Sequence, residues 1–327
     1  MPLRERLLRN WLAAVVGLDG FSMELASGDA SFRRYFRLTL ADGSSRIAMD
    51  APPEREDCGP FVAVAEHLGG LGLNVPIVYR ADLDQGFLLL SDLGCEHYLD
   101  LLKQGETGRL YADALSALLV MQACGKSDWL PPYSRELLSQ EMELFREWLL
   151  RRQLQLTLDG DEQQMLDVVF EQLAANALEQ PQVFVHRDYH SRNLLATPAP
   201  TPGILDFQDA VSGPVTYDLV SLLKDCYVSW PREQVRQWVL GYYELALQSG
   251  VLRTEHEDSF LRWFDLMGVQ RHLKASGIFA RLNIRDGKPG YLQDIPRTLG
   301  YIVELVPEYP ELAPLAGLIS ERVLPAL

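Results

Sequence analysis

Short stretches of alternating hydrophobic and polar residues occupy the first hundred positions and predict a small antiparallel sheet. An amphipathic opening segment is typical of a short helix, and residues 23–25 and the aromatic-rich residues 32–40 are strand candidates. Asp42-Gly43 is a strong hairpin signal, so residues 46–49 are expected to form the returning strand. The chain therefore begins with a helix followed by strand, loop, strand, tight turn and strand.

A helical period appears after Pro52-Pro53. Apolar side chains recur at helical spacing, up to a stop near Gly69-Gly70, at Phe61, Val64, Ala65 and Leu68. Residues 77–79 and 87–90 are two more strand candidates. The order β-β-β-α-β-β is therefore predicted for this part of the chain.

From about His97 onward the pattern is mostly helical. Helices are predicted near residues 110–118, 142–149 and 165–173, short strands at 183–185 and 203–205, and helices again from Thr216 to a proline-containing tail. We therefore expect an α+β protein of two lobes, a small antiparallel-sheet N-lobe (residues 1–93) and a larger helical C-lobe (residues 94–327). Clefts between lobes usually bind ligands, which predicts a ligand near the join at residues 91–94.

The composition excludes some classes of partner. Of the 327 residues, 47% are hydrophobic and 23% charged, which is enough for an ordinary globular core. Lys and Arg number 30 against 45 Asp and Glu, and the resulting net charge of −15 disfavours nucleic acid, which needs a basic face. A small anionic ligand in a local basic pocket is still compatible with this charge.

Membrane insertion, disulfides and zinc are not indicated either. No uninterrupted apolar run approaches the roughly eighteen residues of a membrane span, and the N-terminal segment lacks the apolar core of a signal peptide. The four cysteines form no CxxC pair, which is typical of buried or incidental thiols in a reducing compartment. We expect a cytoplasmic protein with no membrane partner.

Two acidic motifs carry the chemistry. Residues 186–193 read HRDYHSRN, with the spacing HRDxxxxN, and DFQD begins at Asp206; each motif follows a short apolar strand candidate. Phosphoryl transfer from ATP needs such a set, because one carboxylate accepts the proton of the attacking hydroxyl while a second carboxylate and a side-chain amide hold Mg²⁺. A zinc pair at His186 and His190 is disfavoured because no Glu follows His186, and two acids alone support a glycosidase only weakly.

The two motifs resemble those of the aminoglycoside phosphotransferase-like kinases, which share the two-lobed fold of protein kinases, and the resemblance covers essentially the whole chain. Three further stretches resemble the bacterial branch that phosphorylates the anomeric C1 hydroxyl of N-acetylmuramate and N-acetylglucosamine: SGDASFRRYFR at 27–37, MDAPP at 49–53 and QRHLKASGIFAR at 270–281. The resemblance implies a peptidoglycan-recycling kinase that uses ATP and Mg²⁺ and makes a sugar 1-phosphate.

The resemblance also implies roles for single residues. Asp188 matches the catalytic base, and Asn193 and Asp206 match the magnesium ligands. The loop over the phosphates, here with one glycine rather than three, is implied at Ser27, Gly28, Asp29, Ala30, Ser31 and Phe32. The hinge that meets adenine through backbone groups is implied at Ser91, Asp92 and Leu93. Glu66 lies where the helix after the third strand supplies its acid.

One departure from the family pattern concerns the third strand. Kinases of this type usually carry a lysine there, paired with the helix glutamate, whereas residues 46–50 read RIAMD and Met49 falls near the expected place. Another cation must then balance the phosphates. Among the nearby Arg33, Arg34 and Arg46, we take Arg34 as the first candidate for this cation. The alternative is that Arg34 is only an exposed basic residue on a strand. Without a lysine to pair with, Glu66 is either a solvated acid on the helix surface or the partner of an arginine.

Residues for the sugar are expected to be polar, and a lactate carboxylate would need Arg or His. Candidates flank the catalytic groups or lie on the helices that form the acceptor wall in relatives: His190, Gln208, Asp209, Asp225, Arg271 and His272, with Tyr189, Lys224, Tyr227 and Arg281 beside them. For each of these, a structural salt bridge or a satisfied buried polar group is an open alternative.

Two other functions stay open. One is a kinase of another small hydroxylated acceptor of the aminoglycoside or choline type, since a cationic acceptor suits an acidic chain. The other is a pseudokinase that binds without catalysis, which the missing lysine favours and the intact set of Asp188, Asn193 and Asp206 disfavours. For the sugar kinase we expect a small-molecule substrate and a monomer or weak dimer.

Overall fold

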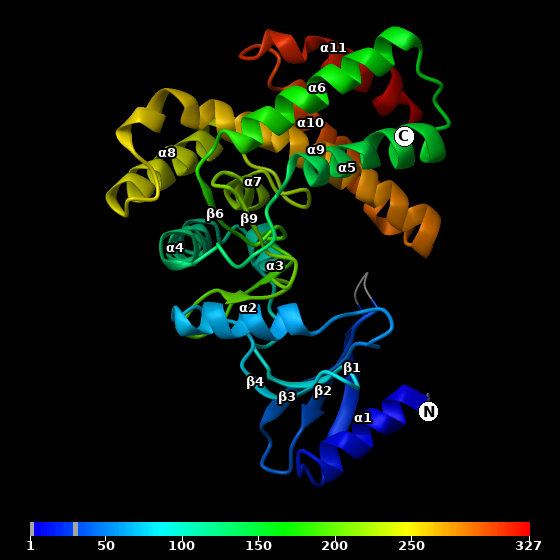
Figure 1. Cartoon of the computed structure of the whole chain (residues 1–327), viewed down its shortest axis with the longest axis vertical. Coiled ribbons are helices and arrows are strands. Elements are labelled where there is room, and N and C mark those ends of the chain that lie inside the picture. The colour runs from blue at the N-terminus through cyan, green and yellow to red at the C-terminus, as the bar shows by residue number, and fades with distance from the viewer. Residues whose placement is uncertain (1–2, 29–31) are drawn as a thin grey trace. The chain divides into compact units, whose positions relative to one another are not determined.

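The computed structural model describes residues 3–28 and 32–327, and the chain separates into two compact units (Figure 1). Unit 1 comprises Met1–His97 and Asn193–Asp209, and unit 2 comprises Tyr98–Arg192 and Ala210–Leu327. The predicted class, an α+β fold with a small antiparallel sheet in one part and helices in the other, is confirmed. The functional division into residues 1–93 and 94–327 stays a prediction, and the return of residues 193–209 to unit 1 was not foreseen.

Unit 1 is built on a five-stranded antiparallel sheet with the order β1-β2-β3-β5-β4. Its strands are β1 (Ser22–Gly28), β2 (Arg34–Thr39), β3 (Ser45–Asp50), β4 (Val78–Asp82) and β5 (Phe87–Ser91). The predicted turn at Asp42-Gly43 is confirmed: Gly43 has φ +82° and its N–H donates to the Leu40 carbonyl at 3.0 Å. The order β-β-β-α-β-β is confirmed as well, with α2 (Gly59–Gly70) after β3.

The first helix, α1 (Leu3–Ala14), covers one face of this sheet (Figure 1). Its buried side chains Leu8, Trp11 and Leu12 follow the period of a helix and share one cluster with residues of three strands: Phe36, Leu38, Ala48, Phe87 and Leu89. Phe36 and Leu38 are two residues apart on β2 and therefore point to the same face. The amphipathic opening segment thus anchors the sheet from which the nucleotide-binding candidates extend.

Unit 2 is mostly helical. Its elements include α3 (Tyr98–Lys103), α4 (Gly108–Cys124), α5 (Arg135–Leu144), the π-helix η1 (Phe145–Gln153), α6 (Gly160–Leu178), α7 (Tyr217–Leu223), α8 (Arg232–Gln248), α9 (Glu257–Asp286), α10 (Ile295–Val303) and α11 (Ala313–Leu318). One two-stranded ladder pairs β6 (Gln182–Val185) with β9 (Val211–Pro214). Short 3-10 helices η2 (Thr254–His256), η3 (Pro289–Asp294), η4 (Pro310–Leu312) and η6 (Leu324–Ala326), with a second π-helix η5 (Ile319–Val323), complete it.

The long helix α9 forms the centre of unit 2 (Figure 1). Eighteen of its thirty residues are buried, because α5, η1, α6, α7 and α10 all pack against it. Gly277 permits the closest of these approaches: a Cβ there would lie 2.3 Å from the Leu144 carbonyl carbon and 2.5 Å from the Phe145 nitrogen. A side chain at this position is therefore incompatible with the backbone where α5 passes into the π-helix η1.

Several elements differ from the predicted pattern. The short strand predicted at residues 203–205 is β8 (Gly203–Ile204), whereas its two-residue partner β7 (Leu194–Leu195) and the strand β9 were not predicted. The proline-containing tail is helical, since its prolines stand at the first turns of η4 and α11, where no N–H is needed. No helix of the described residues is long and apolar enough to cross a lipid bilayer. All four cysteines are free, Cys58 and Cys226 buried, Cys95 and Cys124 exposed.

Candidate active site

The predicted site residues are divided between the two units. The catalytic candidate Asp188 lies in unit 2 with His190, Asp225, Arg271 and His272. Unit 1 holds the metal candidates and all nucleotide candidates, together with Gln208 and Asp209. The motif at residues 186–193 therefore crosses from one unit to the other: Arg192 ends the first segment of unit 2, and Asn193 begins the second segment of unit 1.

The loop that carries Asp188 follows directly on β6 and is held from beneath by Asp218. The Asp218 carboxylate, on α7, accepts the backbone N–H groups of His186 at 2.6 Å and Arg187 at 3.0 Å. These bonds secure an unusual backbone, because Arg187 has φ +76°, a left-handed conformation that non-glycine residues rarely adopt. Asp218 was not predicted, although a lone acid in the apolar run YDLVSLL is a signal for it.

Positive charge surrounds the Asp188 carboxylate. Burial by itself would raise the pKa of Asp188, but Lys274, His190, Arg271 and Arg187 outweigh it and hold that pKa below its usual range. Asp188 is therefore an ionised carboxylate, the form that a proton acceptor requires.

Two of these cations share a buried acid. Glu141 on α5 is 5% exposed, pairs with Arg187, and accepts from Lys274 at 2.9 Å and Gln270 at 3.2 Å. Lys274 also donates to the Tyr217 hydroxyl at 2.8 Å. Because Glu141 is buried together with its partners, it fixes both cations near Asp188. Neither Glu141 nor the role of Lys274 was predicted, since the acid is 47 positions before Asp188 and belongs to no motif.

The predicted sugar residues of unit 2 make internal contacts. Asp225 accepts the Ser191 hydroxyl at 2.5 Å and the backbone N–H groups of Ser191 and Tyr227 at 3.0 and 2.9 Å. Arg271 is buried, with its Nη1 3.7 Å from the Cys226 sulfur. These contacts shape the loop around Asp188, and the sugar-binding roles of both residues stay predictions.

His272 is a buried neutral imidazole. Its Nε2 lies 2.9 Å from the Lys224 carbonyl oxygen, and its ring stacks on Tyr301 at a centroid distance of 4.8 Å. Burial lowers the pKa of His272 to about 3. At neutral pH it therefore carries no charge with which to attract a carboxylate, and its role toward a substrate stays a prediction.

The titration of His272 gives an expected pH dependence of stability. The free energy of unfolding does not depend on His272 above about pH 6.5, the ordinary pKa of histidine, and it declines as the pH falls from there toward 3, because the unfolded chain binds a proton that the folded chain excludes. In His272→Gln, the amide can still donate to the Lys224 carbonyl but does not titrate. Urea unfolding between pH 7.5 and 4 should show a shallower decline in the free energy of unfolding than in the native protein. Parallel curves for the two proteins would contradict this expectation.

In unit 1 the ladder of β7 and β8 brings the two metal candidates together. Leu205 donates its backbone N–H to the Asn193 carbonyl at 2.9 Å, and Asn193 Nδ2 lies 3.3 Å from Asp206 Oδ2. Asp206 has φ +64°, again in the left-handed region. Gln208, a sugar candidate, donates to Asp206 Oδ1 at 2.8 Å and to Asp209 at 3.3 Å. A carboxylate and an amide oxygen held in this way fit the hard-oxygen preference of Mg²⁺.

The cation beside Asp206 is Arg33. Its guanidinium lies 4.0 Å from Asp206 and 3.4 Å from Glu56, in the segment before α2, and it is 9% exposed. Arg34 instead pairs with the buried Asp50 at the end of β3. The same Asp50 accepts from Arg4 at 2.8 Å, so the Arg34 charge is used within the sheet.

The remaining nucleotide candidates are spread along unit 1. Phe32 is exposed, its N–H donates to Glu56 at 3.1 Å, and Glu66 lies on the exposed face of α2. Ser27 and Gly28 end β1, whereas Asp29, Ala30 and Ser31 lie outside the described residues. Their nucleotide roles stay predictions.

The hinge candidates have their side chains engaged within unit 1. Asp92 accepts from Arg37 at 2.6 Å and from the Gly94 N–H at 2.9 Å, and the Ser91 hydroxyl accepts the Ile77 N–H at 2.8 Å. The side chain of Leu93 approaches Gly203. Such a segment can offer backbone groups to a ligand while its side chains hold its shape.

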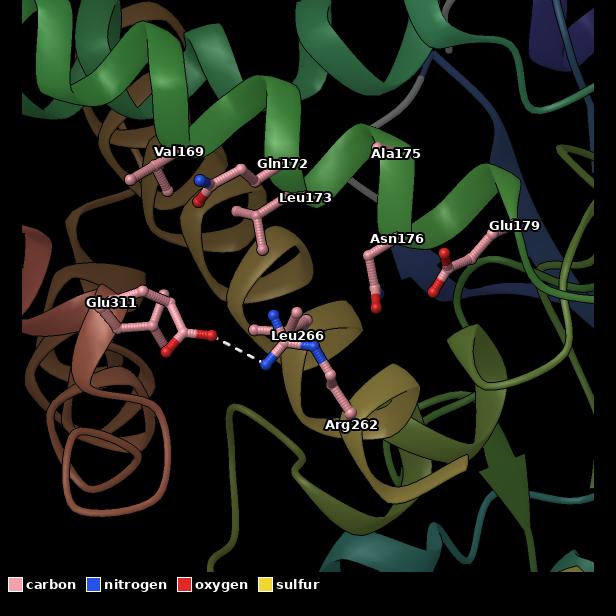
Figure 2. A pocket seen from close by; sticks show the side chains of 10 residues that line it. Val169, Gln172, Leu173, Ala175, Asn176, Glu179, Arg262, Leu266 and Glu311 are labelled. Atoms are coloured by element: carbon pink, nitrogen blue, oxygen red, sulfur yellow. Dashed lines mark hydrogen bonds and ion pairs between the residues drawn. The ribbon is translucent and has the colours of Figure 1, made fainter. Parts of the chain in front are cut away.

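A separate pocket of about 410 Å³ lies in unit 2 between α6, α9 and η4 (Figure 2). Figure 2 shows Asn176 and Glu179 on α6 and an ion pair, 2.7 Å long, between Arg262 and Glu311. Its lining contains none of the predicted site residues. The pocket is therefore separate from the residues that the sequence predicts for catalysis and binding.

Comparisons with known proteins agree with this arrangement. The sequence profile of the "Phosphotransferase enzyme family" matches residues 22–257. The N-acetylmuramate/N-acetylglucosamine kinase of Pseudomonas putida is 49% identical over 300 residues, which cover 92% of this chain and 88% of that protein. A protein of the same name from Neisseria meningitidis serogroup B is 44% identical over 324 residues, 98% of this chain and 96% of that protein. The structure of the GDP complex of aminoglycoside 2'-phosphotransferase-IIIa, 14% identical, aligns with a TM-score of 0.63 over 91% of this chain and 98% of that one, which shows a shared fold.

Proposed function

The chain belongs to the phosphotransferase enzyme family, and from this premise we propose that it is an ATP-dependent kinase of N-acetylmuramate and N-acetylglucosamine. It transfers the γ-phosphoryl group to the anomeric C1 hydroxyl and produces sugar 1-phosphates for peptidoglycan recycling, a reaction of the cytoplasm, where ATP is made. The observation that carries the proposal is the 49% and 44% identity, over nearly the whole chain, to two relatives with that name.

Catalysis in this proposal is mostly positioning and electrostatic stabilisation. Asp188 orients the sugar hydroxyl and accepts its proton, in the ionised form that the surrounding cations favour. An anomeric hydroxyl is more acidic than an ordinary alcohol, so the demand on this base is mild. Asn193 and Asp206 would hold Mg²⁺, which when bound neutralises charge on the phosphates.

Arg33 is the cation that we propose in place of the family lysine. Three observations support Arg33: its side chain is nearly buried, it lies beside Asp206, and it is paired with Glu56. The pairing with Glu56 would correspond to the pairing of the family lysine with the helix glutamate. Arg34, the first candidate from the sequence, is the next residue and the first of β2, and its side chain is paired with Asp50. The acid that completes the pair is then Glu56 rather than Glu66.

Substitution of Arg33 by methionine tests this assignment. We expect kcat/KM for ATP to fall about 100-fold, on the order of the loss when one hydrogen-bond donor to a transition-state oxygen is removed. Arg34→Met is the comparison, and it should lose mainly stability, measured by thermal unfolding, because the buried Asp50 would keep only one of its two arginine partners, Arg4. A larger loss of kcat/KM in Arg34→Met than in Arg33→Met would return the role to Arg34.

A transfer assay tests the function itself. Purified protein, ATP and Mg²⁺ are incubated with N-acetylmuramate, N-acetylglucosamine, glucose, choline or kanamycin, and the phosphate position is determined by phosphorus NMR. A sugar 1-phosphate from the N-acetyl sugars is the expected result. Turnover with choline or kanamycin alone would keep the fold and overturn the substrate, and no turnover at all would favour a non-catalytic binding module.

A further inference from the structure

An arginine packs against two aromatic rings at the end of the Asp188 loop. The guanidinium carbon of Arg192 lies 4.4 Å from the centroid of the Tyr227 ring and 5.2 Å from that of Tyr291 in η3. Phe279 on α9 continues the aromatic group, 6.0 Å from Tyr227 and stacked on Tyr291 at 5.6 Å. Rings on the face of a guanidinium attract it and fix its plane, and the Tyr227 side chain is also a hydrogen-bond partner of Arg192. A guanidinium has five N–H donors, so it can contact more than one partner at a time.

This group is connected to the catalytic loop by short contacts. His190 donates its backbone N–H to the Asp188 carbonyl at 3.0 Å, and its ring centroid lies 5.5 Å from that of Tyr227. Tyr227 in turn lies beneath Arg192. Arg192 therefore lies in the same part of unit 2 as Asp188, and a ligand whose hydroxyl contacts Asp188 can extend toward Arg192.

Other charged groups of this wall are less suited to an external anion. Arg271 and Lys274 are buried, and Arg187 and Lys274 are both held by Glu141. Burial lowers the pKa of His190, so its imidazole is neutral at physiological pH. Arg192, by contrast, is exposed. Asp294, the acid whose charge acts on Arg192, is itself paired with Arg297 at 2.8 Å.

The two sugars of the proposed function differ in one group. N-acetylmuramate carries a lactyl ether on O3, which ends in a carboxylate, and N-acetylglucosamine carries a hydroxyl there. A planar guanidinium is the side chain that best matches a carboxylate, through two parallel hydrogen bonds. Resting on the proposed function, we propose that Arg192, held by Tyr227 and Tyr291, binds the lactyl carboxylate and sets the preference between the two sugars.

Steady-state kinetics of Arg192→Met with both sugars test the proposal. KM for N-acetylmuramate should rise about 10- to 100-fold with kcat little changed, since a charge-assisted bidentate contact made equally in ground and transition states is lost. KM for N-acetylglucosamine should change less than about threefold, because that sugar has no carboxylate to lose. Arg192→Lys, which keeps the charge but not the fork, should lie between the two proteins. Arg253→Met, at an exposed arginine in the same unit, is the matched control.

The methyl ester of N-acetylmuramate gives a second measurement that needs no variant. With the native enzyme, the ester should show the same raised KM that the acid shows with Arg192→Met, and the variant should not distinguish acid from ester. Equal changes for both sugars in Arg192→Met, or an ester that the native enzyme accepts as well as the acid, would overturn the assignment. If the native enzyme phosphorylated neither sugar, the proposed function would fail instead, so the two failures are distinguishable.

Discussion

Asp188→Asn is expected to lower kcat by about 10²- to 10⁴-fold, the contribution of a positioned general base. The amide has the shape of the carboxylate and can still contact the sugar hydroxyl, but it cannot accept its proton. Asp188 is poised for this role because Lys274, Arg271 and Arg187 keep it ionised in spite of burial. The affinity for ATP should change little, since the nucleotide candidates belong to unit 1.

Single-turnover phosphoryl transfer and nucleotide binding, measured on the same preparation, separate these effects. Asp161→Asn, on an exposed residue in the first turn of α6, is the matched control and should retain native turnover. Near-native kcat in Asp188→Asn would remove Asp188 from the role of base. A loss of nucleotide affinity equal to the loss of kcat would indicate a disturbed fold instead, and thermal unfolding would reveal it.

Gly277→Ala is expected to cost about 3 kcal/mol of folding stability or more, at the upper end for a core overpacking mutation. The added methyl would stand 2.3 to 2.5 Å from backbone atoms of Leu144 and Phe145, closer than real Cβ contacts allow. Backbone cannot swing aside as the end of a flexible side chain can. Either α9 or the junction of α5 and η1 must move, and α9 and α5 carry Lys274 and Glu141, which pair beside the Asp188 loop.

Gly300→Ala provides the control within the same unit. Gly300 lies in α10, and a Cβ there would meet no atom within 4 Å. Because alanine is a better helix former than glycine, this variant should unfold at the native denaturant concentration or slightly above it. Equal midpoints in urea for Gly277→Ala and Gly300→Ala would show that α9 does not need the close approach at Gly277.

The sequence predicted the regular elements that a strong period marks. The sheet of unit 1 could be predicted because its strands have five to seven residues, and because Asp42-Gly43 indicates the hairpin between β2 and β3. A two-residue strand has no period to detect, so β7 and its pairing with the predicted strand β8 were not foreseen. The π-helix η1 has apolar positions that imitate an α-helix, and it begins where Gly277 of α9 lies against the backbone, a tertiary contact that the local sequence does not reveal.

The site divides in the same way. Asp188, Asn193 and Asp206 could be found because phosphoryl transfer needs these groups at short spacings along the chain. Glu141 and Asp218 reach the Asp188 loop only through the fold, and nothing in the local sequence distinguishes Glu141 from an exposed helix acid. Neighbouring residues at a strand point to opposite faces, and the sequence alone does not say which of two adjacent arginines faces Asp206.

The return of residues 193–209 to unit 1 has a consequence for biosynthesis. Asn74 donates to Thr197 at 3.0 Å and to the Pro200 carbonyl at 2.8 Å, and the rings of Phe61 and Phe207 lie 4.9 Å apart. Unit 1 is therefore completed by a segment that is synthesised late. More than a hundred residues separate His97 from Asp209, and at about 5–20 residues per second their translation takes roughly 5 to 20 s. During that interval the N-terminal part of unit 1 has been synthesised but lacks residues 193–209. Unit 1 can be completed only after the Asp188 loop has been synthesised.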